Sequence, residues 1–136
     1  MKELRLPTGL ERRWETMGFL QLYIYRILDS KGAAFLEVMK EARKIYEFYG
    51  AGGEELFILD NTAGKYSLTG LWETIPASES EKIWIGLSQY ESAAHCQEVL
   101  RKVDADPAID LLYEKMIEIV GSASRILHGE FQHMPY

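Results

Sequence analysis

The 136-residue sequence lacks the features that mark several large classes of protein. It has a single cysteine, so no disulfide can form within the chain, which fits a reducing compartment. No apolar run approaches the ~18 residues that a membrane-spanning helix needs, and the first residues carry charges where a signal peptide is apolar. We therefore expect a cytoplasmic protein that is neither secreted nor inserted in a membrane.

The sequence also lacks an excess of basic residues and the common cofactor motifs. Fifteen lysines and arginines against twenty-one acidic residues give a net charge of −6, and a field of this sign repels phosphate backbones. Nucleic acid is therefore an improbable partner. No phosphate loop, dinucleotide fingerprint or nucleophile elbow is present, because the glycines at 50–53 lack a preceding strand and a following helix. We expect no cofactor.

What the sequence does contain is enough apolar material for one packed core. Hydrophobic residues make up 47% and aromatic residues 12% of the chain, as in a single globular domain. Residues 1–16 are charged and contain Pro7 and Gly9, so they are interpreted as an N-terminal extension. The domain is predicted to span residues 17–136.

The periodicity of apolar residues predicts an α+β domain. Alternation indicates strands, and spacings of three and four indicate helices. Helix starts are marked by Asp29 or Ser30, by Ser92, and by Asp106 with Pro107. The predicted elements, in order, are a strand at 19–27, a helix that starts after Asp29 or Ser30 and runs up to Gly50, a hairpin of strands 55–60 and 65–75 with its turn at 61–64, a strand at 82–90, helices at 92–103 and 107–120, and a strand at 124–134.

This order fits a ferredoxin-like split βαβ fold, an antiparallel sheet with helices on one face. On the first strand, Leu20, Leu22 and Ile24 share one face, and Tyr23 and Tyr25 share the other. We expect the aromatic face, together with Trp84 and Trp72, to be the one that the helices leave open. Because so much aromatic surface is costly to expose, the sequence predicts a homodimer that pairs two open sheet faces.

One segment resembles a known family closely. Residues 90–107 contain Tyr90, Ser92, Ala94, His95, Val99, Lys102, Val103, Asp106 and Pro107, which follow the pattern YxSxAHxxxVxxKVxxDP. This pattern is similar to that of an uncharacterised bacterial and archaeal family of small cytoplasmic proteins, within the dimeric α/β-barrel, ferredoxin-like superfamily. Further matches cover about residues 17–134: Gly18 and Phe19, the AxKIY segment followed by Gly50 and Ala51, and Arg125, Gly129 and Phe131.

The resemblance implies a fold and a dimer rather than an activity. The superfamily includes cofactor-free monooxygenases that form quinones, haem-degrading enzymes and small-molecule isomerases, and a shared fold does not settle function. The chain departs from the family near its end, where His128 and Glu130 replace a common tyrosine and glycine. This departure weakens any inference of a shared ligand.

His95 and Cys96 are adjacent at the start of a predicted helix. Adjacent helical residues point about 100° apart, so the pair can neither chelate a metal nor act as a nucleophile with its base. Cys96 lies on the apolar stripe, which favours a buried and inert thiol. His95 is interpreted mainly as a hydrogen-bonding residue at the corner between strand and helix, with contact to a ligand as the alternative.

His128 and Glu130 form the second candidate group. At positions i and i+2 of a strand they share a face, and we expect that face to line the space between the two sheets of the dimer. A structural reading, in which both groups are solvated at the edge of an interface, is the simpler alternative.

Two functions follow from these predictions. The first is a homodimer that binds a small apolar or aromatic molecule between the sheets, without catalysis. The second is a cofactor-independent monooxygenase or isomerase acting on an aromatic or quinone-like compound, with His128 as general base, Glu130 orienting it, and Tyr23, Tyr25, Trp72 and Trp84 as walls. Haem binding, with His128 as the axial ligand of the iron, is a third and weaker hypothesis.

Overall fold

The computed structural model describes residues 17–60 and 65–136, so the predicted N-terminal extension at 1–16 lies outside the described residues. The elements are β1 (Phe19–Leu28), the 3-10 turn η1 (Asp29–Lys31), α2 (Gly32–Phe48), β2 (Gly53–Ile58), α3 (Leu71–Thr74), β3 (Glu81–Tyr90), α4 (Ala93–Asp104), α5 (Pro107–Val120), the 3-10 turn η2 (Ala123–Arg125) and β4 (Leu127–Gln132). No helix in these two ranges is long and apolar enough to cross a membrane.

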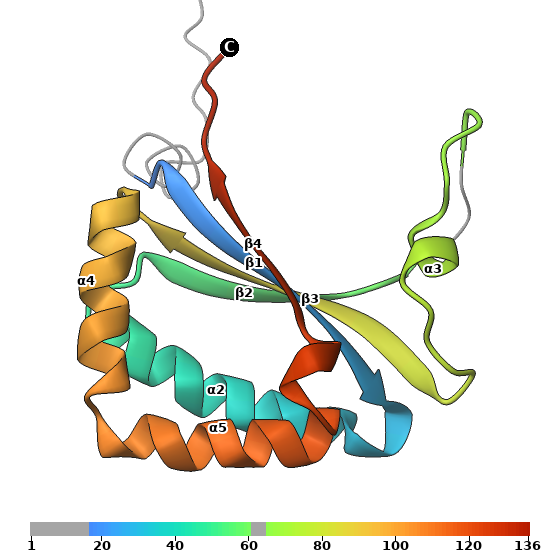
Figure 1. The fold of residues 1–136 in the computed structure, drawn as a ribbon, viewed down its shortest axis with the longest axis horizontal. Coiled ribbons are helices and arrows are strands. Elements are labelled where there is room, and N and C mark those ends of the chain that lie inside the picture. Colours follow the sequence, from blue (N-terminus) through green and yellow to red (C-terminus); the bar gives the residue numbers. More distant parts are fainter. Residues whose placement is uncertain (1–16, 61–64) are drawn as a thin grey trace, which may run out of the picture.

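The four strands form one antiparallel sheet in the order β2-β3-β1-β4. The two central strands pair along their whole length, from Phe19 opposite Tyr90 to Leu28 opposite Glu81. The long helices α2, α4 and α5 all lie on one side of the sheet (Figure 1). This arrangement confirms the predicted ferredoxin-like α+β fold.

Local sequence signals start and end the helices of the second half. The Ser92 side chain caps α4 by accepting a hydrogen bond from the His95 backbone N–H at 3.1 Å. Asp106 caps α5, and Pro107 occupies its first turn. A proline fits there because the first backbone N–H groups of a helix have no partner within the helix, so the missing N–H of proline costs nothing. Gly121 ends α5 with φ of 99°, a conformation that costs glycine little. These starts agree with the sequence prediction.

The predicted hairpin is wrong in its second strand. β2 forms and pairs with β3, but residues 65–75 contain turns and the short helix α3 instead of a strand. Tyr66 and Ser67 adopt φ values of 55° and 66°, which an extended strand does not allow. The predicted turn at 61–64 lies outside the described residues.

The start of the first helix is also later than predicted. Asp29 and Ser30 lie in η1, and α2 begins at Gly32 without a side-chain cap on its first turn.

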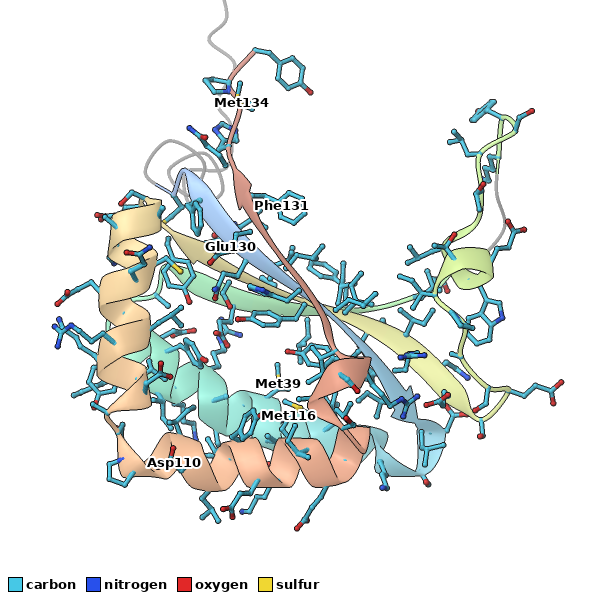
Figure 2. All side chains as sticks on the ribbon, in the orientation of Figure 1. Met39, Asp110, Met116, Glu130, Phe131 and Met134 are labelled. Atoms are coloured by element: carbon cyan, nitrogen blue, oxygen red, sulfur yellow. The ribbon has the colours of Figure 1, made fainter. Side chains whose placement is uncertain are left out.

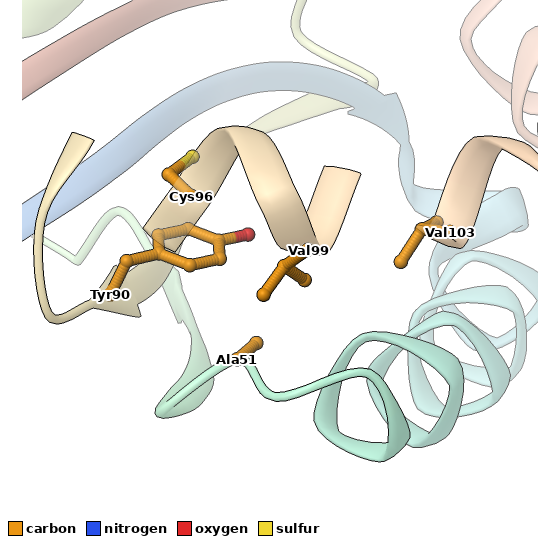
Figure 3. Close-up of a cluster of buried hydrophobic side chains, with 5 residues drawn as sticks. All are labelled: Ala51, Tyr90, Cys96, Val99 and Val103. Atoms are coloured by element: carbon orange, nitrogen blue, oxygen red, sulfur yellow. The ribbon is translucent and has the colours of Figure 1, made fainter. Parts of the chain in front are cut away.

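The core lies between the sheet and the helices in two clusters. One consists of Ala51, Tyr90, Cys96, Val99 and Val103, where α4 meets the end of β3 (Figure 3). The other consists of Tyr25, Ile27, Phe35 and Val120, where α2 and α5 meet the middle of β1. The two clusters are separated along β1, because Tyr90 of the first pairs with Phe19 at the start of this strand and Ile27 of the second lies near its end.

An ion pair holds the end of α5 to the sheet just before β4 begins. Arg125 donates to Glu81 at 2.6 Å and to the backbone carbonyl of Val120 at 2.8 Å. Glu81 is only 7% exposed, and the bonds from Ser78 and Arg125 hold the pKa of its carboxyl below the usual range.

The prediction of which sheet face is open is wrong. Tyr25 is 5% exposed and packs edge-on against Phe35 of α2, and Phe35 in turn contacts Trp84. Residues directly opposite in an antiparallel sheet share a face, so His128 and Glu130, paired with Tyr23 and Gln21, are on this helix-covered face too. Figure 2 shows Glu130 and Phe131 pointing to opposite sides of β4. The aromatic residues therefore face the helices, not a partner.

The open face is aliphatic instead. On this face, aliphatic and aromatic residues of neighbouring strands lie opposite one another. The pairs are Leu22 with Leu87, Ile24 with Ile85, Ile85 with Phe57, Ile24 with Leu127 and Leu20 with Phe131. Phe57, Leu127 and Phe131 are about half exposed, at 51%, 45% and 49%.

Candidate functional site

A cavity of about 710 Å³ lies between the sheet and the three long helices. This volume is within the ~300–1,000 Å³ range of small-molecule sites. The residues that line it come from β1, α2, β2, β3, α4, α5 and the end of η2, and include Tyr23, Tyr25, Leu36, Met39, Ala42, Tyr46, Glu54, Leu56, Ser88, Leu100, Asp104, Leu112, Tyr113, Met116 and Ile126. The cavity therefore lies within one chain, on the helix side of the sheet.

A polar row crosses the sheet at the end of the cavity near α4. The register places Glu54 opposite Ser88, Ser88 opposite Gln21, and Gln21 opposite Glu130, so one residue of each strand contributes. The Ser88 hydroxyl donates to Glu54 Oε1 at 2.9 Å, and Gln21 Nε2 donates to Glu130 Oε2 at 3.1 Å. The hydroxyl of Tyr23 donates to Gln21 Oε1 at 3.0 Å. Gln21 and Ser88, at the centre of the row, are 2% and 5% exposed, and buried polar side chains are costly unless they are hydrogen-bonded or serve a function.

Glu54 is the only acidic residue of this row that lines the cavity within the described part of the chain. Burial raises the pKa of its carboxyl to about 7, against the opposing effect of the Ser88 hydrogen bond. Arg43 of α2 is the nearby cation, but its side chain pairs with Glu47. Among the described residues no ion pair engages Glu54, which leaves the carboxyl without a fixed counter-charge.

Phenols surround this carboxyl. Burial raises the pKa of Tyr23 to about 12 and raises the pKa values of Tyr25 and Tyr46 further, so all three hydroxyls stay protonated at neutral pH. The hydroxyl of Tyr90 is buried without a hydrogen-bond partner in the described residues. This end of the cavity therefore combines the carboxyl groups of Glu54 and Asp104 with the phenol hydroxyls of Tyr23, Tyr25 and Tyr46.

The other end of the cavity is apolar. Met39 of α2 and Met116 of α5 lie beside each other in the space beneath the sheet (Figure 2), and with Leu56 and Ile126, which also line the cavity, they pack against the second core cluster. Methionine side chains are flexible and adapt to varied ligand shapes. The cavity thus combines an apolar end with a polar end, which suits a largely apolar molecule that carries a polar group at one end.

The structure separates the residues that the sequence predicted as one site. Tyr23 and Tyr25 line the cavity, whereas Trp84 packs on Phe35 in the core and Trp72 lies in α3, in the connection from β2 to β3. His128 is exposed on the edge strand, with its ring 4.7 Å from that of Tyr23. Glu130 is also exposed, at the far end of the polar row.

His95 and Cys96 have structural surroundings. His95 Nδ1 accepts a hydrogen bond from the Glu91 backbone N–H at 3.0 Å, and its ring contacts Tyr90 edge-on. Cys96 is 1% exposed, and burial raises the pKa of its thiol to about 11. The described residues contain no group of three or more His, Cys, Asp or Glu side chains that could hold a metal ion.

Sequence reasoning missed Glu54, Ser88, Gln21 and Tyr46. The available signal was that Glu54, Ser88 and Gln21 each occupy a strand position whose alternating neighbours are apolar or aromatic. A polar side chain on a buried face is more informative than an apolar one.

Comparison with solved structures supports the fold. The chain is similar to a crystal structure of a NipSnap family protein of unknown function from Agrobacterium tumefaciens, with 12% identity and a TM-score of 0.54, over 89% of this chain and 92% of that one. A second crystal structure of the same Agrobacterium protein gives 12% identity and a TM-score of 0.53, over 87% of this chain and 95% of that one. At this identity the likeness concerns the fold alone.

No family model and no curated protein matches the chain. The resemblance to the family with the YxSxAHxxxVxxKVxxDP pattern therefore stays a prediction.

Proposed function

We propose that the protein binds a small, largely apolar molecule with one polar end in the cavity between its sheet and its helices. The observation that carries this proposal is the cavity itself, about 710 Å³ with methionines and leucines at one end and Glu54 at the other. The location differs from the sequence prediction, which placed the ligand between two sheets. The ligand we expect is a ring system that carries an oxygen.

Binding would be tested with 2-tetralone, a bicyclic aromatic ketone, by isothermal titration calorimetry. Ala42 lines the cavity from α2, so Ala42→Phe fills the space that the ligand needs. Ala33→Phe is the matched control, because Ala33 is exposed on the same helix. We expect Ala42→Phe to weaken binding at least about tenfold, equivalent to ~1.4 kcal/mol, and Ala33→Phe to leave it unchanged. Equal binding by all three proteins would contradict the proposed site.

We also propose that two copies of the chain associate through their open sheet faces. Support comes from the aliphatic residues of that face, since an apolar patch of this kind is unusual on a monomer. A two-fold axis places the same patch on both partners and closes the assembly at two. The sequence predicted this interface for its aromatic residues, whereas the side chains now proposed to form it are Leu22, Ile24, Ile85 and Leu87.

Size-exclusion chromatography with light scattering tests the dimer. The wild-type mass should be about twice the chain mass of 15.6 kDa. Leu22→Glu places a charge at the centre of the patch and should give a monomer. Leu111→Glu is the control, because Leu111 is 55% exposed on α5, away from the open face. A monomeric wild type would refute the proposal, and so would a dimer that survives Leu22→Glu.

The alternative function, a cofactor-independent monooxygenase or isomerase, gains no support at the position that the sequence assigned to it. His128 and Glu130 are exposed on the edge strand, and neither lines the cavity. If the protein is an enzyme, its acid–base group belongs where the ligand is enclosed.

A further inference from the structure

We propose that Glu54 is a catalytic base that takes a proton from a carbon next to the carbonyl group of a cyclic ketone bound in the cavity. The inference rests on the proposed function and names both the substrate class and the residue that acts on it. It differs from the sequence hypothesis, in which His128 was the base.

The geometry around Glu54 carries the proposal. Ser88 donates to Oε1, and among the described residues no hydrogen bond engages Oε2, so one carboxylate oxygen is available to a ligand. Met116 and Leu112 can hold an apolar ring against the opposite end of the cavity. A carboxylate that is held by one hydrogen bond, lines a cavity and forms no ion pair among the described residues is arranged as a base rather than as an ion-pair partner.

Tyr46 supplies the second element of the chemistry. It lines the cavity from α2, and its phenol stays protonated at neutral pH because burial raises its pKa. A neutral phenol can donate a hydrogen bond to the ketone oxygen as negative charge develops there. The arrangement therefore pairs a base with a donor for the oxygen of the same substrate.

The step balances without an oxidant or a second reactant. The C–H bond next to the carbonyl breaks, its proton goes to Glu54, and its electron pair forms the C=C bond of an enolate whose negative charge rests on oxygen. Tyr46 donates a hydrogen bond to that oxygen. The protonated Glu54 carboxyl exchanges its proton with solvent and then protonates the same carbon or, in an unsaturated ketone, the far carbon of the conjugated system, which isomerises the double bond. In D₂O this exchange replaces the substrate hydrogen by deuterium.

The charged and titratable groups around Glu54 set its pH dependence. On the elements that line the cavity they are Lys40, Arg43, Tyr46 and Glu47 of α2, Tyr23 and Tyr25 of β1, Glu55 of β2, Asp104 of α4, and Asp110 and Tyr113 of α5, with the hydroxyl of Ser88 from β3. The three buried phenols stay neutral because burial raises their pKa values, and Arg43 is paired with Glu47, whereas the pKa of Glu54 is raised into the neutral range. The rate should rise with pH until the Glu54 carboxyl, with a pKa of about 7, is ionised.

The experiment follows deuterium exchange into 2-tetralone in D₂O by proton NMR, with binding measured separately by calorimetry. We expect exchange above the buffer rate, a loss of roughly a hundredfold in Glu54→Gln, and no change in Glu114→Gln, an exposed residue of α5. Tyr46→Phe should slow exchange by about tenfold or more, at little cost to binding.

Binding of 2-tetralone without accelerated exchange would overturn this inference and leave the proposed function standing. Equal exchange by the wild type and Glu54→Gln would overturn it as well. Absence of binding in the calorimeter would contradict the proposed function and, with it, the inference.

Discussion

Replacing Glu54 by glutamine should change the way in which the stability of the protein depends on pH. The folded state raises the pKa of this carboxyl from 4.5 to about 7, so folding favours its protonated form. Its ionisation therefore costs stability progressively as the pH rises from about 4.5 to about 7, and the cost is constant above that. This difference in pKa between the folded and unfolded states corresponds to at most about 3 kcal/mol of stability, and water that enters the cavity reduces this cost.

Glutamine keeps the size and the hydrogen-bonding capacity of the side chain but cannot ionise. We expect the free energy of unfolding of Glu54→Gln, minus that of the wild type, to become more positive by ~1–3 kcal/mol between about pH 4 and pH 8. Urea denaturation at constant ionic strength measures both proteins at each pH. Shifts of other groups, such as the lowered pKa of Glu81, cancel in the difference. A difference that does not change with pH would refute the argument that the Glu54 carboxyl is desolvated.

Three further substitutions or treatments test the surroundings of the cavity. Arg125→Met should lower the free energy of unfolding by about 2 kcal/mol in urea denaturation at pH 7, because it leaves the Glu81 carboxylate without its ion pair. A loss below about 0.5 kcal/mol would contradict a stabilising role for this ion pair. His95→Ala should lower the free energy of unfolding by about 1 kcal/mol in the same assay, because the imidazole accepts a hydrogen bond from the Glu91 backbone N–H. Its affinity for 2-tetralone should be unchanged, and weakened binding would instead indicate that His95 contacts the ligand. Cys96 should react with a disulfide reagent at pH 8 far more slowly in the folded protein than in urea, because the thiol is buried and its pKa is raised to about 11, and equal rates would contradict this burial.

The elements of this fold could be predicted where local chemistry determines them. Ser92, Asp106 and Pro107 mark helix starts because a side-chain cap or a proline ring acts within a few residues of its own position. Residues 65–75 were predicted as a strand from alternation alone. That pattern did not reveal the positive φ values at Tyr66 and Ser67, and β3 already has β2 as its partner on that side.

The orientation of the sheet could not be deduced in the same way. Both faces of β1 are rich in apolar residues, so alternation separates the residues into two sets but does not say which set the helices cover. Aromatic residues were expected on a dimer interface, yet Tyr25 and Trp84 pack against Phe35 of α2. Because of this error, the predicted site was placed on the face of the sheet opposite to the cavity that the structure contains.

The site itself depended on pairing across strands that are far apart in the sequence. Glu54, Ser88 and Gln21 become neighbours only through the registers of β2 with β3 and of β3 with β1. The cavity likewise depends on how far α2 and α5 stand from the sheet, which side-chain periodicity does not determine. Tyr23 and Tyr25, which the sequence predicted as walls of a site between two sheets, line the cavity on the helix side instead.

Methyl NMR of methionine tests most directly whether the cavity beneath the sheet is the binding site. Met39 and Met116 line the cavity, whereas Met134 lies beyond the end of β4, away from it (Figure 2). With ¹³C-methyl methionine and increasing 2-tetralone, the signals of Met39 and Met116 should shift together and saturate, while the signal of Met134 stays in place. Saturable shifts at Met134 alone, or no shift at Met39 and Met116 while calorimetry reports binding, would contradict the account.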